Sequence, residues 1–333
     1  MNAPVPLGIG EFEADTIPLL RLRVQAIRWQ ADAILAFELV DPDGAELPPA
    51  TAGAHVDVHL PDGLLRSYSL SGDPADRTVW TLGVLREVNG QGGSRSMHES
   101  VRVGELLTVS APRNAFAMVP GAAHTVLLAG GIGITPIKAM AHTLIAEGKS
   151  FELHYCARTA RNVAFTGELR ALVPRDRLHF HFDNGVPGQG LNIANLLKQQ
   201  PDGAHLYYCG PVGLMKACAE ASTHWAPGSV HFEHFKPPEP AVKAAPDVSF
   251  EVRLARRGIT VPVSADQSIV RAIELAGLRV PTSCLSGLCG SCKVDYLEGK
   301  VEHNDYILSD EEKTRCLTVC VSRSLSPLLV LDL

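Results

Sequence analysis

The first third of the chain contains short segments in which apolar and polar residues alternate. Between about Leu20 and Pro120 these segments read VQAIRW, ILAFELV, HVDVHL, WTLGVL and LLTVS, and turn clusters such as DPDG, PDG and SGDPAD separate them. A period of two places successive side chains on opposite faces of a strand, so the pattern predicts antiparallel strands. Several short strands at this spacing indicate a small β-barrel.

The pattern changes near Gly121 to apolar strands that alternate with helical segments. HTVLLAGG precedes PIKAMAHTLIAEG, FELHYCAR precedes FTGELRALV, and HLYYCGP precedes LMKACAEAS. Strands that alternate with helices predict an α/β domain with a parallel sheet and crossover helices. KPPEPAVKAAPD then lacks apolar periodicity and is rich in Pro and Ala, which is typical of a linker. We therefore predict domains at 17–120, 121–235 and 248–333, with a linker at 236–247.

Composition narrows the functional classes. The chain has 333 residues, a formal net charge of −6, 46% hydrophobic and 20% charged residues. These values are typical of globular protein, and the absence of a basic excess argues against a nucleic-acid partner. No signal-peptide pattern and no apolar stretch long enough to span a bilayer occurs in the sequence, so we expect a cytoplasmic protein without a membrane partner.

Three of the eight cysteines lie within CLSGLCGSC, Cys284 to Cys292, with the spacing C-x4-C-x2-C. With a distant fourth cysteine this is the plant-type [2Fe–2S] spacing, and Cys316 and Cys320 both compete for the fourth place. Gly287 and Gly290 permit the loop backbone to approach the sulfurs. The alternatives are a zinc site, which more often has two short-spaced ligand pairs, and buried apolar cysteines.

Two glycine-containing turns follow apolar strands and precede helices. In AGGIGITP, Ala129 to Pro136, we expect Thr135 as N-cap, Pro136 at the first helical position, and Gly148 just after the helix. A pyrophosphate can bind at such a helix N-terminus, although the G-x-G-x-x-G fingerprint is absent. CGPVGLM, Cys209 to Met215, is the second turn. Two such turns at strand ends would flank one crevice, which favours a dinucleotide.

The barrel segment carries two elements suited to phosphate. RSYSL places Arg66, Tyr68 and Leu70 on one face of a strand, and an aromatic ring beside a cation suits a planar, phosphorylated ligand. GQGGS, Gly90 to Ser94, precedes the helix-like SRSMHES and offers backbone N–H groups to an anion. Together they favour a phosphorylated flavin over a solvated edge strand.

In their order along the chain, RSYSL, GQGGS, AGGIGITP, CGPVGLM, CLSGLCGSC and CVSRS resemble the phthalate dioxygenase reductase family from about Leu19 to Leu333. The family joins a ferredoxin–NADP reductase-like flavoprotein to a C-terminal plant-type ferredoxin domain. The resemblance implies a β-barrel flavin domain, an α/β nucleotide domain and an α+β ferredoxin domain of the β-grasp type.

The resemblance also implies roles for individual residues. FMN would be held by Arg66, Ser67, Tyr68, Ser69, Val84, Leu85, Gly92, Gly93 and Ser94. The nicotinamide dinucleotide would be held by Gly131, Gly133, Thr135, Pro136, Asp183, Cys209, Gly210 and Pro211. Ser69, Cys209 and Phe235 would lie at the reacting rings, and Asp183 at the adenosine ribose favours NADH. Leu85 departs from the pattern, since relatives often carry lysine there.

For the cluster, the resemblance assigns Cys284, Cys289, Cys292 and Cys320 as ligands and leaves Cys316 as a neighbouring thiol. The expected function is the NADH-dependent reductase of a Rieske-type oxygenase system, in which electrons pass from NADH to FMN to [2Fe–2S] to a separate terminal oxygenase. Because NADH delivers hydride and the cluster accepts single electrons, a flavin must stand between them. A reductase for another acceptor, such as a cytochrome, and a non-catalytic redox-sensing or zinc-bearing module are the alternatives. We expect a monomer.

Overall fold

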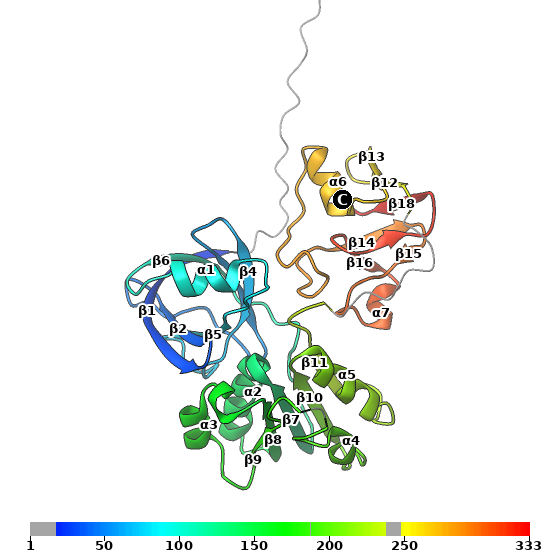
Figure 1. Ribbon diagram of the computed structural model, residues 1–333. Helices are drawn as coiled ribbons and strands as arrows, with labels where there is room; N and C mark the ends of the chain where they lie inside the picture. Colours follow the sequence, from blue (N-terminus) through cyan, green and yellow to red (C-terminus); the bar gives the residue numbers. More distant parts are fainter. Residues whose placement is uncertain (1–17, 187, 238–247) are drawn as a thin grey trace, which may run out of the picture. The chain divides into compact units, whose positions relative to one another are not determined.

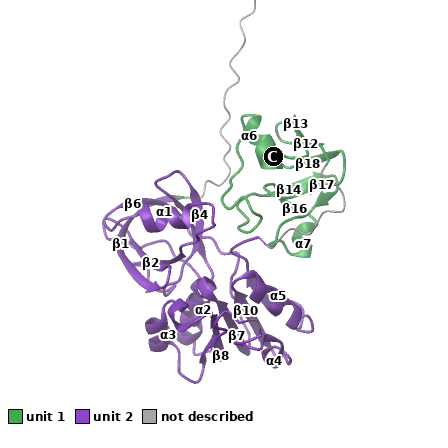
Figure 2. Ribbon diagram, in the orientation of Figure 1, with its two compact units in different colours: residues 1–18, 243–333 green, residues 19–242 purple. Residues whose placement is uncertain are grey.

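The computed structural model describes residues 18–186, 188–237 and 248–333 (Figure 1). Within these residues the chain divides into a larger compact unit, from Leu19 to Pro237, and a smaller one, from Val248 to Leu333 (Figure 2). The predicted linker at 236–247 lies outside the described residues except for Lys236 and Pro237. Lys236 Nζ lies 2.9 Å from Glu87 Oε1 within the larger unit.

The larger unit begins with an antiparallel six-stranded sheet in the order β4-β3-β6-β1-β2-β5. Its strands are β1 (Leu19–Ala31), β2 (Ile34–Val40), β3 (His55–His59), β4 (Leu65–Ser69), β5 (Trp80–Leu85) and β6 (Leu106–Ser110). An antiparallel bridge between Leu70 and Leu82 joins the two edges, which closes the sheet around an apolar core. The alternation in the sequence therefore predicted this domain correctly. Helix α1 (Gly93–Ser100) follows β5, and His98 Nε2 lies 2.9 Å from the Val84 carbonyl oxygen.

The second part of this unit is a parallel five-stranded sheet in the order β11-β10-β7-β8-β9. Its strands are β7 (His124–Gly130), β8 (Phe151–Ala157), β9 (Leu178–Phe182), β10 (Ala204–Cys209) and β11 (Val230–Glu233). Residues of α2 (Ile134–Ala146) and α3 (Thr166–Leu172) cover one face, and residues of α5 (Val212–Ala221) and the short α4 (Ile193–Leu196) cover the other. The strand and helix alternation predicted this arrangement.

The barrel and the parallel sheet contact each other closely. A Cβ at Gly83 of β5 would lie 2.6 Å from Thr135 Cγ2, so only glycine fits there. Lys138 of α2 is buried, and its Nζ donates to the Ser71 carbonyl and pairs with Glu168 Oε2 at 2.6 Å. These contacts fix the end of the barrel against the parallel sheet and its helices.

The smaller unit, green in Figure 2, is a mixed sheet in the order β13-β12-β18-β14-β16 with α6 (Ile269–Leu275) packed on it. The strands are β12 (Phe250–Leu254), β13 (Ile259–Val263), β14 (Lys293–Glu298), β16 (Cys316–Thr318) and β18 (Leu328–Leu331). A small ladder joins β15 (Val301–Glu302) to β17 (Arg323–Ser324), and α7 (Asp310–Lys313) begins with a capping box between Ser309 and Glu312. No helix in the described ranges has the length and hydropathy needed to cross a bilayer.

Candidate functional site

The two predicted glycine turns lie side by side at the carboxyl edge of the parallel sheet. β7 and β10 are hydrogen-bonded neighbours, and a Cβ at Gly133 would lie 2.2 Å from the Cys209 carbonyl oxygen. A Cβ at Gly210 would lie 3.0 Å from Gly130 Cα. The glycines thus allow two backbone segments to meet where ligands of parallel sheets bind.

The helix after the first turn begins earlier than predicted. A 3₁₀ turn at Gly131–Gly133 leads directly into α2, so Gly133 is the N-cap and Ile134 the first helical residue. The predictions of Thr135 as N-cap and of Pro136 at the first helical position are therefore wrong. Thr135 Oγ1 donates to the Ile132 carbonyl instead. Gly131 has φ +52 with open space around it, so a ligand can approach its backbone. Gly148 does follow the helix in the left-handed region, as predicted.

Asp183 lies at the same carboxyl edge, directly after β9. Its Oδ1 accepts a hydrogen bond of 2.8 Å from the Gly185 N–H, which orders the turn that follows the strand. β8 stands between β9 and β7, so Asp183 is two strand spacings, about 10 Å, from the first glycine turn, which follows β7. A ribose at this separation from a pyrophosphate is consistent with the predicted role.

In the barrel, Arg66 and the Gly90–Ser94 turn are brought together. Arg66 donates to the Gln91 carbonyl oxygen at 2.9 Å, and a Cβ at Gly93 would lie 2.4 Å from Arg66 Cγ. The Ser94 hydroxyl accepts from the Glu87 N–H, and Gly92 (φ 88) starts α1. The guanidinium and the first N–H groups of a helix therefore meet at one place, a donor set that fits a flavin phosphate.

The side chains of the other barrel residues in the predicted flavin site are buried in the core, hydrogen-bonded to a neighbour, or partly buried. Tyr68 packs against the barrel core, and burial raises the pKa of its hydroxyl. Ser67 donates to Asp57 Oδ1 at 2.7 Å. The Val84 side chain is in the core, so only its backbone is available to a ligand, whereas Leu85 is half-buried against the nucleotide-binding part.

Glu233 is a candidate site residue that the sequence analysis did not identify. It ends β11, pairs in register with Cys209, and its Oε2 lies 3.5 Å from the Ser69 hydroxyl of β4. Burial raises the pKa of Glu233 to about 8, and burial also raises the pKa of the Cys209 thiol. Ser69, Cys209 and Glu233 thus form one cluster, with the 37% exposed Phe235 two residues further along. An acidic residue inside the aromatic segment HFEHF was the available signal.

The four predicted ligand cysteines converge in the smaller unit. Cys284 and Cys289 hydrogen-bond to each other, as do Cys292 and Cys320. The Cys284 sulfur accepts from the N–H groups of Ser286 and Leu288, both at 3.4 Å. The hydrogen bond with the Cys292 thiol lowers the pKa of Cys320, and a hydrogen bond from the Gly287 N–H lowers this pKa further. Four thiols with backbone donors around them are the donor set of a [2Fe–2S] cluster.

Loop conformation explains the small residues between these cysteines. Gly287 (φ 70), Gly290 (φ 74) and Leu285 (φ 52) all occupy the left-handed region. A Cβ at Gly287 would lie 3.1 Å from Asp305 Cα, so a larger residue would displace the loop. The Cys316 thiol is buried on β16 and donates instead to the Glu312 carbonyl oxygen at 3.2 Å, which separates it from the other four.

Comparisons with known proteins match both units. Residues 252–324 match the "2Fe-2S iron-sulfur cluster binding domain" and residues 127–220 match the "Oxidoreductase NAD-binding domain". The chain is 48% identical to the tert-butanol monooxygenase / tert-amyl alcohol desaturase reductase subunit of Aquincola tertiaricarbonis, over 94% of this chain and 96% of that protein. It is 41% identical to the phthalate dioxygenase reductase of Burkholderia cepacia, over 94% and 97% of the two chains.

Solved structures also match nearly the whole chain. A phthalate dioxygenase reductase structure aligns with TM-score 0.71 and 40% identity over 95% of this chain and 98% of its own. A type IV self-sufficient cytochrome P450 monooxygenase aligns with TM-score 0.88 and 36% identity over 99% of this chain, which spans 43% of the monooxygenase.

Proposed function

The chain belongs to the phthalate dioxygenase reductase-like family, and from that membership we propose that it passes electrons from NADH, through FMN and a [2Fe–2S] cluster, to a Rieske-type terminal oxygenase. It is an NAD(P)H-dependent flavin and iron–sulfur oxidoreductase that serves as the reductase of an oxygenase system. FMN as the flavin, NADH as the donor, the residue roles, a monomeric state and a cytoplasmic location belong to the proposal. Eight free cysteines agree with a reducing compartment.

One observation carries the proposal: four convergent cysteines, three in the Cys284–Cys292 loop and the fourth at Cys320, occur in the same chain as two glycine turns that meet at the edge of a parallel sheet. Cys284, Cys289, Cys292 and Cys320 would hold the cluster. When bound, the flavin supplies the exchange between a two-electron hydride donor and a one-electron acceptor.

The protein's own groups have distinct tasks at the nucleotide site. Arg66 and the N-terminus of α1 bind the flavin phosphate, and the turns at Gly131 and Gly210 bind the dinucleotide. Ser69 orients the flavin edge, and Cys209, whose side chain is fully buried, lies beside the nicotinamide. Glu233, held next to Ser69, presents a carboxyl group whose charge depends on pH near neutrality.

Spectroscopy and reconstitution test this function. The purified protein should show both flavin and iron–sulfur absorption, and NADH should bleach both under anaerobic conditions. Acid-released flavin should keep its fluorescence after phosphodiesterase treatment, as FMN does, whereas FAD would brighten. A protein that lacks either chromophore when expressed with iron and riboflavin would refute the proposal.

A second acceptor class has a specific observation in its favour. Because the chain aligns over 99% of its length with part of a self-sufficient cytochrome P450 monooxygenase, a haem monooxygenase is the alternative acceptor. Reduction of a Rieske-type oxygenase from the same host, measured beside a cytochrome P450 from that host, distinguishes the two.

A further inference from the structure

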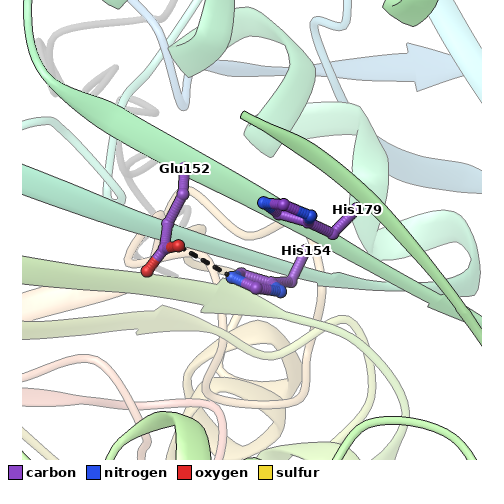
Figure 3. A group of neighbouring side chains, drawn as sticks. All are labelled: Glu152, His154 and His179. Atoms are coloured by element: carbon purple, nitrogen blue, oxygen red, sulfur yellow. Dashed lines mark ion pairs between the residues drawn. The ribbon is translucent and has the colours of Figure 1, made fainter. Parts of the chain in front are cut away.

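A second group of metal-ligating side chains lies on the parallel sheet, away from its carboxyl edge. Glu152 and His154 extend from β8 and His179 extends from the neighbouring β9 (Figure 3). Each side chain offers one ligand atom, and these three atoms all lie within 4.8 Å of one another. The cysteine loop and the glycine turns do not include any of these residues.

Strand geometry brings the three side chains together. Glu152 and His154 are two residues apart on one strand and so share a face of the sheet. His154 pairs in register with His179, and the two imidazole rings stack with centroids 4.8 Å apart and 23° between their planes. The cluster is therefore fixed by the pairing of β8 with β9.

The central histidine has an unmet bonding requirement. His154 is 6% exposed, and its Nε2 is buried. Nε2 lies 3.3 Å from Glu152 Oε2, an ion-pair contact drawn in Figure 3, but the two atoms do not meet in hydrogen-bonding geometry. When Nε2 carries a lone pair, it faces a carboxylate oxygen that can only accept, and a bound cation between the two atoms would satisfy both.

Neighbouring groups hold His154 and Glu152 in position. The other ring nitrogen of His154, Nδ1, lies 3.0 Å from His181 Nε2, so His154 can donate there while Nε2 presents its lone pair. Glu152 Oε1 lies 4.0 Å from His124 Nε2, and His124 Nδ1 lies 2.8 Å from the Ser150 hydroxyl. Histidine ligands in metal sites are characteristically oriented through their second nitrogen in this way.

We propose that Glu152, His154 and His179 form a binding site for a divalent transition-metal ion, with Zn²⁺ as the best fit. Two imidazoles and one carboxylate suit zinc, whereas magnesium and calcium prefer oxygen alone. Tetrahedral zinc with bonds of about 2.0–2.1 Å sets its ligands roughly 3.3 Å apart, so the site must contract by about 1.5 Å. Glu152 is 33% exposed and His179 lies on the edge strand β9, so both can move.

A bound ion would join β9 to β8 and leave a fourth position for water. Because Asp183 follows β9 directly, the ion would also steady the strand that presents the predicted ribose contact. The site does not depend on the proposed electron-transfer function.

Equilibrium dialysis of the untagged protein, loaded with flavin and cluster, against micromolar ZnCl₂ tests the site. Zinc and iron are both counted by mass spectrometry, since the iron content shows whether the cluster cysteines are occupied. We expect one zinc ion per chain, and we expect His179→Ala and Glu152→Gln each to weaken zinc binding at least tenfold.

His205→Ala is the matched control. His205 also stacks on a histidine of the adjacent strand, His231, at 5.2 Å, but belongs to no group of three potential ligands in the described ranges. This variant should bind zinc like the unmodified protein, and zinc should raise the Tm of both. An unchanged zinc content in folded Glu152→Gln or His179→Ala, or no zinc bound by the unmodified protein, would overturn the proposal.

Discussion

The Ser69 hydroxyl lies 3.5 Å from Glu233 Oε2, which joins the last residue of the barrel strand β4 to the last residue of the nucleotide-sheet strand β11. The two residues are 164 positions apart in the chain. Their contact places a titratable carboxyl group, with a pKa raised to about 8 by burial, beside the fully buried Cys209.

The first prediction concerns the charge on Glu233. Loss of hydride leaves positive charge on the nicotinamide, and a nearby carboxylate favours that charge. The rate of flavin reduction by NADH should therefore rise as pH increases through about 8, and Glu233→Gln should remove this rise and lower the rate roughly tenfold or more. Stopped-flow absorbance across that pH range measures both effects.

The same group has a predicted effect on stability. Since the pKa of folded Glu233 lies above its usual value, the carboxyl destabilises the fold progressively as pH rises from about 4.5 to about 8. Glu233→Gln should thus raise Tm above pH 8 relative to the unmodified protein. The exposed Glu46→Gln is the control and should change neither the rate profile nor the Tm, and a pH profile retained in Glu233→Gln would contradict the assignment.

The second prediction separates the two candidate fourth ligands. Cys320 is hydrogen-bonded to Cys292 and accepts from the Gly287 N–H, whereas the Cys316 thiol donates to the Glu312 carbonyl oxygen. We expect Cys320→Ser to abolish or grossly alter the EPR signal of the dithionite-reduced cluster and Cys316→Ser to leave it essentially intact. The reverse result would move the fourth ligand to Cys316.

Much of this arrangement was predictable because it depends on local patterns. Strand alternation in the barrel, strand and helix alternation in the nucleotide-binding part, and the spacing of Cys284, Cys289 and Cys292 are all properties of short segments. The Glu233 contact depends instead on how β4 and β11 meet, and the Glu152 group depends on the register of β8 with β9. The predicted N-cap at Thr135 was wrong because the three residues before α2 form a 3₁₀ turn, so that the helix begins before Thr135.

The third prediction concerns nucleotide choice. A carboxylate at the adenosine ribose repels a 2′-phosphate, so the protein should prefer NADH over NADPH. Asp183→Ala should shift the ratio of kcat/KM values toward NADPH by roughly tenfold, which corresponds to about 1.4 kcal/mol. Asp202→Ala, at an exposed turn before β10, is the control for loss of surface charge. Equal kcat/KM values for NADH and NADPH in the unmodified protein would show that Asp183 does not select between the two nucleotides at the adenosine ribose.

The central claim is that hydride is accepted in the larger unit and that electrons leave through the cluster of the smaller unit. The most direct measurement is stopped-flow absorbance of a protein truncated near Pro240, mixed anaerobically with NADH. We predict that the folded truncation keeps its flavin, is bleached by NADH and reduces ferricyanide, but reduces cytochrome c or the oxygenase poorly in comparison with the full chain. A folded, flavin-loaded truncation that NADH fails to bleach would contradict the account, because hydride transfer would then require the ferredoxin domain.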